Sequence, residues 1–124
     1  MAKVLIVDDE PDILLLLRLN LEVAGFETGL AADGDEALQR LRREHFDVVL
    51  LDLAMPVLDG FGVLTALRDD PAAPPVVVLT AYANTQGYRE RAFSLGARAF
   101  VAKPPDFDSL PDELRAAIGG REQG

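Results

Sequence analysis

Polar side chains of different kinds follow four short apolar runs of this chain, each at the point where a run ends. In chain order they are Asp8 and Asp9, then Asp52, then Thr80, and last Lys103. Three carboxylates, a hydroxyl and an ammonium suit a hard divalent cation together with a phosphoryl group. The set can act as one site only if the fold brings the four run ends to one place.

The three carboxylates would repel one another there, and such repulsion raises a pKa or requires a counter-cation. Oxygen ligands without Cys or His favour Mg²⁺, or else Mn²⁺, over zinc. Asp8 and Asp9 taken alone have a second interpretation, because acidic residues also favour the beginning of a helix. Asp52 stands at the end of a different run, and this favours the metal site.

Asp52, Thr80 and Lys103 suit the chemistry of a phosphoryl group. A carboxylate can attack phosphorus and hold it as an acyl phosphate. The Thr80 hydroxyl can donate a hydrogen bond to a phosphoryl oxygen, although threonine is also an ordinary turn residue at a strand end. Lys103 can bridge a carboxylate and a phosphoryl group, or it can be a solvated lysine. Pro104 follows it, so the bond between them is a candidate for a cis peptide.

The four runs are rich in valine and end in polar or turn residues, which is typical of strands that a parallel sheet buries on both faces. They cover residues 3–7, 47–51, 76–79 and 99–102, and a weaker strand is predicted at 26–31. Helices are predicted over residues 11–24, 33–44, 60–68, 85–95 and 109–118. The alternation predicts the α/β class, with a doubly wound, five-stranded parallel sheet. Ligands bind such a sheet at the carboxyl ends of its strands, where the polar residues lie.

The composition fits one globular domain, with 124 residues, 49% of them hydrophobic and 27% charged. We expect this domain to cover residues 1–120 and residues 121–124 to form a frayed tail. No stretch is apolar for long enough to cross a membrane, no export signal is evident and cysteine is absent, so a cytoplasmic protein is expected. A net charge of −9 gives no electrostatic footprint for binding nucleic acid. The single histidine, His45, is expected at the surface.

Four motifs together resemble the response regulator receiver domain of bacterial two-component systems. They are VDDE at 7–10, DLAMPVLDG at 52–60, LTA at 79–81 and KP at 103–104. The resemblance implies a flavodoxin-like sheet with the strand order 2-1-3-4-5. It also implies a role for each site residue: Asp52 as phosphoacceptor, Asp8, Asp9, Asp52 and the backbone carbonyl of Ala54 as Mg²⁺ ligands, Thr80 and Lys103 as the phosphoryl-sensing pair, and Phe100 as the switch aromatic.

The function implied by the resemblance is a phosphorylation-dependent switch. A sensor histidine kinase or a histidine phosphotransfer protein would supply the phosphoryl group in a Mg²⁺-dependent reaction. The surface of the fourth helix, fifth strand and fifth helix would then change and regulate an output partner. The only catalysis expected is the chain's own phosphoryl uptake and autodephosphorylation. Because no second domain follows the last helix, a stand-alone regulator or one with a missing effector domain is expected.

Two other functions are compatible with part of the motif set. A Mg²⁺-dependent aspartate-nucleophile phosphatase would also use an aspartate, a cation and a lysine, but it normally has an acid or base two residues after the nucleophile, where this chain has Ala54. A pseudo-receiver that only binds partners would not need all five site residues. Both alternatives fit the sequence less well than the switch.

The chain departs from the family pattern near its end. Pro105 stands where the family often has phenylalanine, with Phe107 two residues further on, and Pro111 leaves the start of the last helix open. The segment 97–99 lacks the acidic pair of many DNA-binding regulators, which weakens any expectation of their dimer. Since phenylalanine has no hydroxyl to bury, Phe100 should populate its inward position even without phosphate.

The first predicted helix has leucines on more than one side. Ile13, Leu17 and Leu21 share the side expected to be buried, whereas Leu15 and Leu19 fall elsewhere. Loose amphipathicity explains this pattern, and so does an apolar strip that contacts a partner.

Overall fold

The computed structural model describes the backbone of residues 1–123 and the side chains of residues 1–119. Strands and helices alternate along the chain, as predicted. The strands are β1 (Lys3–Val7), β2 (Glu27–Ala31), β3 (Val48–Leu51), β4 (Val76–Thr80) and β5 (Ala99–Ala102). The helices are α1 (Pro11–Val23), α2 (Gly34–Arg43), α3 (Gly60–Leu67), α4 (Tyr88–Ser94) and α5 (Leu110–Gln123).

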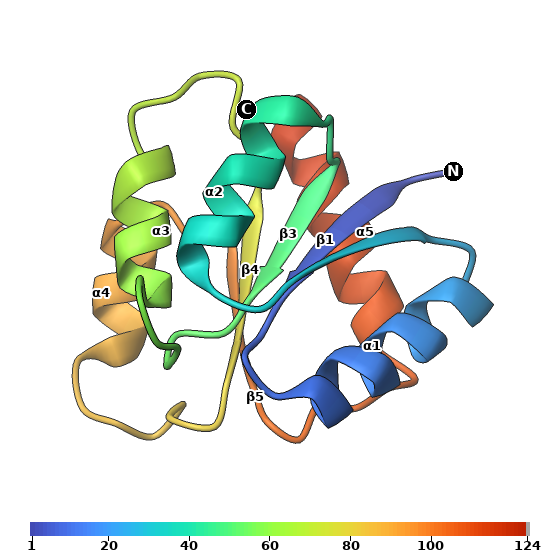
Figure 1. Cartoon of the computed structure of the whole chain (residues 1–124), viewed down its shortest axis with the longest axis horizontal. Helices are drawn as coiled ribbons and strands as arrows, with labels where there is room; N and C mark the ends of the chain where they lie inside the picture. Colours follow the sequence, from blue (N-terminus) through green and yellow to red (C-terminus); the bar gives the residue numbers. More distant parts are fainter. Residues whose placement is uncertain (124) are drawn as a thin grey trace.

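All strand pairs are parallel, and the sheet has the order β2-β1-β3-β4-β5. Figure 1 shows α1 and α5 on one side of the sheet and α2, α3 and α4 on the other. This is the doubly wound architecture predicted from the sequence. The strand order differs from the chain order, so segments distant in sequence become neighbours at the sheet edge.

Each face of the sheet has its own hydrophobic core, because successive side chains of a strand point to opposite faces. Leu5 and Val7 of β1 pack with α2, α3 and α4, whereas Val4 and Ile6 pack with α1 and α5. Because both faces are buried, the sequences of the central strands are continuous apolar runs.

Three elements differ from the sequence prediction. The strand β5 lies at a sheet edge and is only partly buried, so it is not a strand covered on both faces. The helix α4 begins at Tyr88 rather than residue 85, because Gly87 adopts a left-handed conformation with φ 84° directly before it. The helix α5 begins at Leu110 and extends to Gln123, past the predicted end at residue 118.

The tail expected at residues 121–124 stays a prediction. The backbone of its first three residues continues α5, but their side chains and the whole of residue 124 lie outside the described part of the chain. Among the described residues, no helix combines the length and apolar character that a membrane span requires.

Candidate functional site

The site lies where β1, β3, β4 and β5 end at one edge of the sheet. Val7 is the register partner of Leu51, so the residues that follow them, Asp8 and Asp52, are neighbours. The Asp52 amide donates to the Val7 carbonyl at 3.0 Å. The Lys103 amide donates to the Thr80 carbonyl at 2.9 Å. Backbone pairing thus brings together residues that are far apart in the sequence.

The ammonium of Lys103 lies among three carboxylates. Its Nζ is 2.6 Å from Asp8 Oδ2, 3.4 Å from Asp52 Oδ2 and 3.5 Å from Glu10 Oε1. The Lys103 side chain is only 10% exposed, and Asp8 and Asp52 are 2% and 5% exposed. Lys103 is therefore not a solvated lysine, and the peptide bond that joins it to Pro104 is cis, as the sequence suggested.

The pKa values of the site reflect burial and mutual charge. The pKa of Asp52 is raised to about 6, chiefly by burial and also by the charge of Asp8, against the opposing effects of Lys103 and the Ala54 amide. Burial would lower the pKa of Lys103, but the hydrogen bond that Lys103 donates to Asp8 and the charges of Asp52 and Asp8 raise that pKa above its ordinary value. At neutral pH the site therefore holds an ionised carboxylate that is poorly solvated, which favours its reaction with an electrophile or its pairing with a cation.

Four carboxylates could hold a metal ion together. One oxygen each of Asp8, Asp9, Glu10 and Asp52 lies within 4.8 Å of the others. Asp8 and Asp52 are buried whereas Asp9 and Glu10 are exposed, so the cluster opens to solvent on one side. Oxygen donors of this kind fit a hard divalent cation. Sequence reasoning did not assign Glu10 to this cluster, although it directly follows Asp9.

Thr80 ends β4, and Phe100 lies on the neighbouring strand β5. Thr80 is fully buried, and its hydroxyl oxygen accepts a hydrogen bond from the Tyr82 amide at 3.1 Å, which leaves the hydroxyl proton available to another acceptor. Phe100 is partly buried and packs against the core and the ring of Phe93 on α4. The Thr80 hydroxyl is thus buried with its proton uncommitted to the Tyr82 amide, and the Phe100 ring is only partly buried.

The loop between β3 and α3 ends in an aspartate and a glycine that fix the start of α3. The side chain of Asp59 caps α3 by accepting from the Gly62 amide at 2.9 Å. A Cβ at Gly60 would clash with the backbone of Asp52 and Leu53. The aspartate–glycine pair of the motif therefore has a local reason, since only glycine lets α3 begin so close to the strand.

The outer face of α1 carries exposed leucines. Leu15, Leu16 and Leu19 are 52%, 53% and 52% exposed, whereas Leu17 and Leu21 are buried as predicted. A groove of about 360 Å³ extends from Glu10 and Lys103 at the site, past Leu16, to Phe107. Leu15 and Leu19 therefore do not belong to the core, and sequence reasoning missed that Leu16 shares their exposure.

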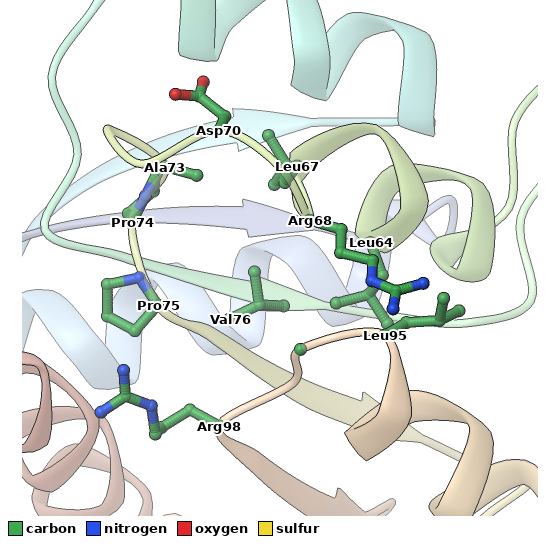
Figure 2. Close-up of a pocket in the computed structure, with 11 residues that line it drawn as sticks. Leu64, Leu67, Arg68, Asp70, Ala73, Pro74, Pro75, Val76, Leu95 and Arg98 are labelled. Carbon is green, nitrogen blue, oxygen red and sulfur yellow. The ribbon is translucent and has the colours of Figure 1, made fainter. Parts of the chain in front are cut away.

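Two further features lie away from the site. A cavity of about 170 Å³ at the opposite sheet edge is shown in Figure 2, and it contains none of the predicted site residues. Pro75, Arg98 and the ends of α3 and α4 surround it. The His45 side chain is 76% exposed beside Asp47, as expected for a surface residue.

The sequence matches the model of the response regulator receiver domain over residues 4–115. It is 41% identical over 118 residues to the transcriptional regulatory protein KdpE of Mycobacterium tuberculosis (strain CDC 1551 / Oshkosh), covering 95% of this chain and 51% of KdpE. It is 40% identical over 116 residues to the probable transcriptional regulator ycf27 of Porphyridium aerugineum, covering 94% and 46%. The chain thus spans about half the length of these curated relatives.

Solved receiver structures have the same fold. The receiver domain of the Francisella response regulator 1452 gives a TM-score of 0.88 at 31% identity, covering 97% of this chain and 98% of that one. The response regulator TrrA of Thermotoga maritima, in complex with Mg²⁺ and BeF, gives 0.84 at 34% identity, covering 94% and 99%. The receiver domain of the sensor histidine kinase PA1611 of Pseudomonas aeruginosa PAO1, with a magnesium ion in its active-site cleft, gives 0.86 at 32% identity, covering 95% and 98%.

Proposed function

The chain belongs to the response regulator receiver domains, which are signalling switches, and we propose that its Asp52 is the residue that accepts the phosphoryl group. The observation that carries this proposal is the placement of the Lys103 ammonium between Asp8 and Asp52 at the carboxyl edge of the sheet. A cation there balances the charge of a buried nucleophile before reaction and can bind the phosphoryl oxygens after it.

The proposed step is a transfer from a phosphohistidine of a sensor histidine kinase or of a histidine phosphotransfer protein. A carboxylate oxygen of Asp52 attacks phosphorus, the new P–O bond forms as the P–N bond breaks, and the imidazole leaves with the electron pair. Lys103 stabilises the negative charge of the phosphoryl group, and the Thr80 hydroxyl donates to one of its oxygens. Hydrolysis of the same acyl phosphate returns the protein to its resting state.

The metal ligands proposed are Asp8, Asp9, Asp52 and the backbone carbonyl of Ala54, and the ion is Mg²⁺, with Mn²⁺ as a substitute. When bound, the ion supplies positive charge that reduces the repulsion between the acidic site and the incoming phosphoryl group. The buried and exposed halves of the cluster support this assignment, because Mg²⁺ commonly retains several waters beside its carboxylates.

The output would follow from Thr80 and Phe100. Movement of Thr80 toward the phosphoryl group vacates space that the Phe100 ring can fill, and the surface of α4, β5 and α5 changes. An output protein, or an effector domain like those of the longer transcriptional regulators, would read this surface. Direct binding of nucleic acid by this domain is not proposed, since its net charge is −9.

Acetyl phosphate with Mg²⁺ provides the test. Intact mass spectrometry should show one labile phosphoryl group on the wild-type chain and none on Asp52→Asn, whose amide has the same shape but cannot form an acyl phosphate. Asp9→Asn should slow the labelling, and Asp59→Asn, an exposed cap outside the site, should not. Stable labelling of Asp52→Asn at the wild-type rate would exclude Asp52 as the acceptor.

A further inference from the structure

An arginine and two phenylalanine rings form a cluster on the surface of α4 and β5. The guanidinium carbon of Arg89 lies 5.1 Å from the centre of the Phe93 ring and 6.0 Å from the centre of the Phe100 ring. The two ring centres are 6.4 Å apart, with an angle of 43° between the ring planes. We call Arg89 and Phe93 the α4 clasp.

The clasp contacts Phe100 from the solvent side. Arg89 and Phe93 are four residues apart on α4, so their side chains share one helix face. Both are exposed, whereas Phe100 is partly buried between them and the core. The Phe100 ring therefore has a polar and aromatic cover on one side and the interior of the sheet on the other.

Both contacts fall within the distances at which they attract. A guanidinium within about 6 Å of a ring centre is drawn to the face of the ring. Two rings with centres about 4.5–7 Å apart also attract each other. We call the described position of the Phe100 ring, in contact with both residues of α4, the outward position. A ring that moved away from α4, toward Thr80, would lose both contacts, so both contacts stabilise the outward position.

We propose that the α4 clasp holds Phe100 outward and thereby sets how strongly phosphorylation must act to switch the protein. This inference rests on the proposed role of Phe100 as the switch aromatic. Phenylalanine loses no hydroxyl contact when it turns inward, so the inward position should be populated even without phosphate, and the clasp limits that population. The phosphoryl group then shifts an equilibrium whose starting point is set by Arg89 and Phe93.

The size of the effect follows from the strength of one exposed cation–π contact. Loss of the Arg89 charge should raise the ratio of inward to outward Phe100 by about two- to fivefold. Arg89→Lys retains a cation and should restore most of the outward population. Arg98→Gln removes the same charge from an adjacent surface segment. Within the described residues the Arg98 guanidinium contacts no aromatic ring, so this variant should not change the ratio.

Fluorine NMR of protein labelled with 4-fluorophenylalanine measures this ratio directly. The Phe100 signal is assigned by its absence in Phe100→Leu, and spectra are compared for wild type, Arg89→Gln, Arg89→Lys and Arg98→Gln. Each protein is measured first without phosphodonor and then with Mg²⁺ and acetyl phosphate. Without phosphodonor, the Arg89→Gln signal should lie part of the way toward the phosphorylated position, while the other two variants stay close to wild type.

The two spectra separate failure of the clasp from failure of the switch. If acetyl phosphate moves the wild-type Phe100 signal but Arg89→Gln coincides with wild type before phosphorylation, the clasp is wrong and the switch stands. If the wild-type signal stays fixed while mass spectrometry shows full labelling of Asp52, Phe100 is not a switch residue and the clasp falls with it. Equal displacement by Arg98→Gln would also overturn the clasp, because the effect would then be one of general surface charge.

Discussion

The site and the outer face of α1 are adjacent, yet they break the usual rule of burial in opposite ways. At the site, Asp8, Asp52 and Lys103 are charged and almost fully buried. On α1, Leu15 and Leu19 are apolar and about half exposed. The groove that begins at Lys103 reaches α1 at Leu16, while Leu15 and Leu19 lie outside its lining.

Each exception reduces the stability of the folded chain, and neither is needed for folding. Buried charges lose solvation unless they are paired, and exposed leucines gain nothing from burial in the monomer. The first cost is explained by reaction at Asp52. The second is explained if a phosphodonor that reaches Asp52 also covers the leucines of α1, since contiguous exposed apolar surface often marks an interaction site. The comparison predicts that mutations at the site change the stability of the protein, whereas mutations on the outer face of α1 change phosphotransfer from a partner protein.

The largest effect on stability is expected from Lys103→Met. Removal of the ammonium leaves Asp8 and Asp52 buried without their partner, and breaking a buried pair typically costs about 3–5 kcal/mol. Urea unfolding in EDTA measures this loss. Lys3→Met is the matched control, because its ion pair with Glu44 is more exposed and should contribute much less to stability. Equal losses of stability for the two variants would contradict the claim that burial makes the charges of the site contribute more than an exposed ion pair.

Magnesium should stabilise the protein by a somewhat smaller amount. Binding to the folded state alone contributes about 2.7 kcal/mol at a hundredfold excess of ligand over the dissociation constant. Thermal melting in EDTA and in millimolar Mg²⁺ measures the gain, and Asp9→Asn should reduce it. Identical melting curves in the two buffers would contradict the proposed metal site.

Asp52→Asn should stabilise the metal-free protein in a manner that depends on pH. The folded pKa of Asp52, about 6, is above its ordinary value of 3.8, so the folded state holds the proton more tightly. Below about pH 4 the carboxyl is protonated in both states, and the variant and wild type should be equally stable on this account. As pH rises through 6, wild type loses stability, and the variant should lead by on the order of 1–2 kcal/mol at pH 7.5. Urea unfolding in EDTA from pH 4 to 8 tests this, and a constant difference across the range would contradict it.

The smallest effect on stability is expected from the double variant Leu15→Glu with Leu19→Glu. Exposed positions usually contribute within about 0.5 kcal/mol, whereas Leu17→Ala on the buried side should cost about 2–5 kcal/mol. Phosphotransfer from a partner protein should weaken in the double variant while labelling by acetyl phosphate stays unchanged. Unfolding of the double variant would show that these leucines support the core and that the two regions do not differ as described.

The sequence was sufficient to predict the fold and the meeting of Asp8, Asp52 and Lys103 at one sheet edge, because both follow from topology. Runs such as Val76–Thr80 are apolar on both faces, and parallel strands deliver the residues that follow them to one edge. The Asp33 cap was predictable as well, since its side chain accepts from the Glu36 amide at 2.8 Å.

Features that depend on tertiary geometry could not be predicted. The late start of α4 depends on the left-handed backbone of Gly87, which glycine permits but does not impose. Glu10 joins the acidic cluster because of the direction of its side chain, which spacing does not encode. Among the carboxylates, Asp8 lies nearest to the Lys103 ammonium, and this too depends on distances between side chains that the sequence does not encode.

The hydrogen bond from the Tyr82 amide to the Thr80 hydroxyl has a spectroscopic consequence. The chain has no tryptophan and two tyrosines, and Tyr88, the other tyrosine, packs edge-on against Phe61. In a Tyr88→Phe variant, ultraviolet emission would come from a single phenol attached to the residue that bonds Thr80. We expect that phenol to report optically on events at the sheet edge, and stopped-flow fluorescence can test this without any label.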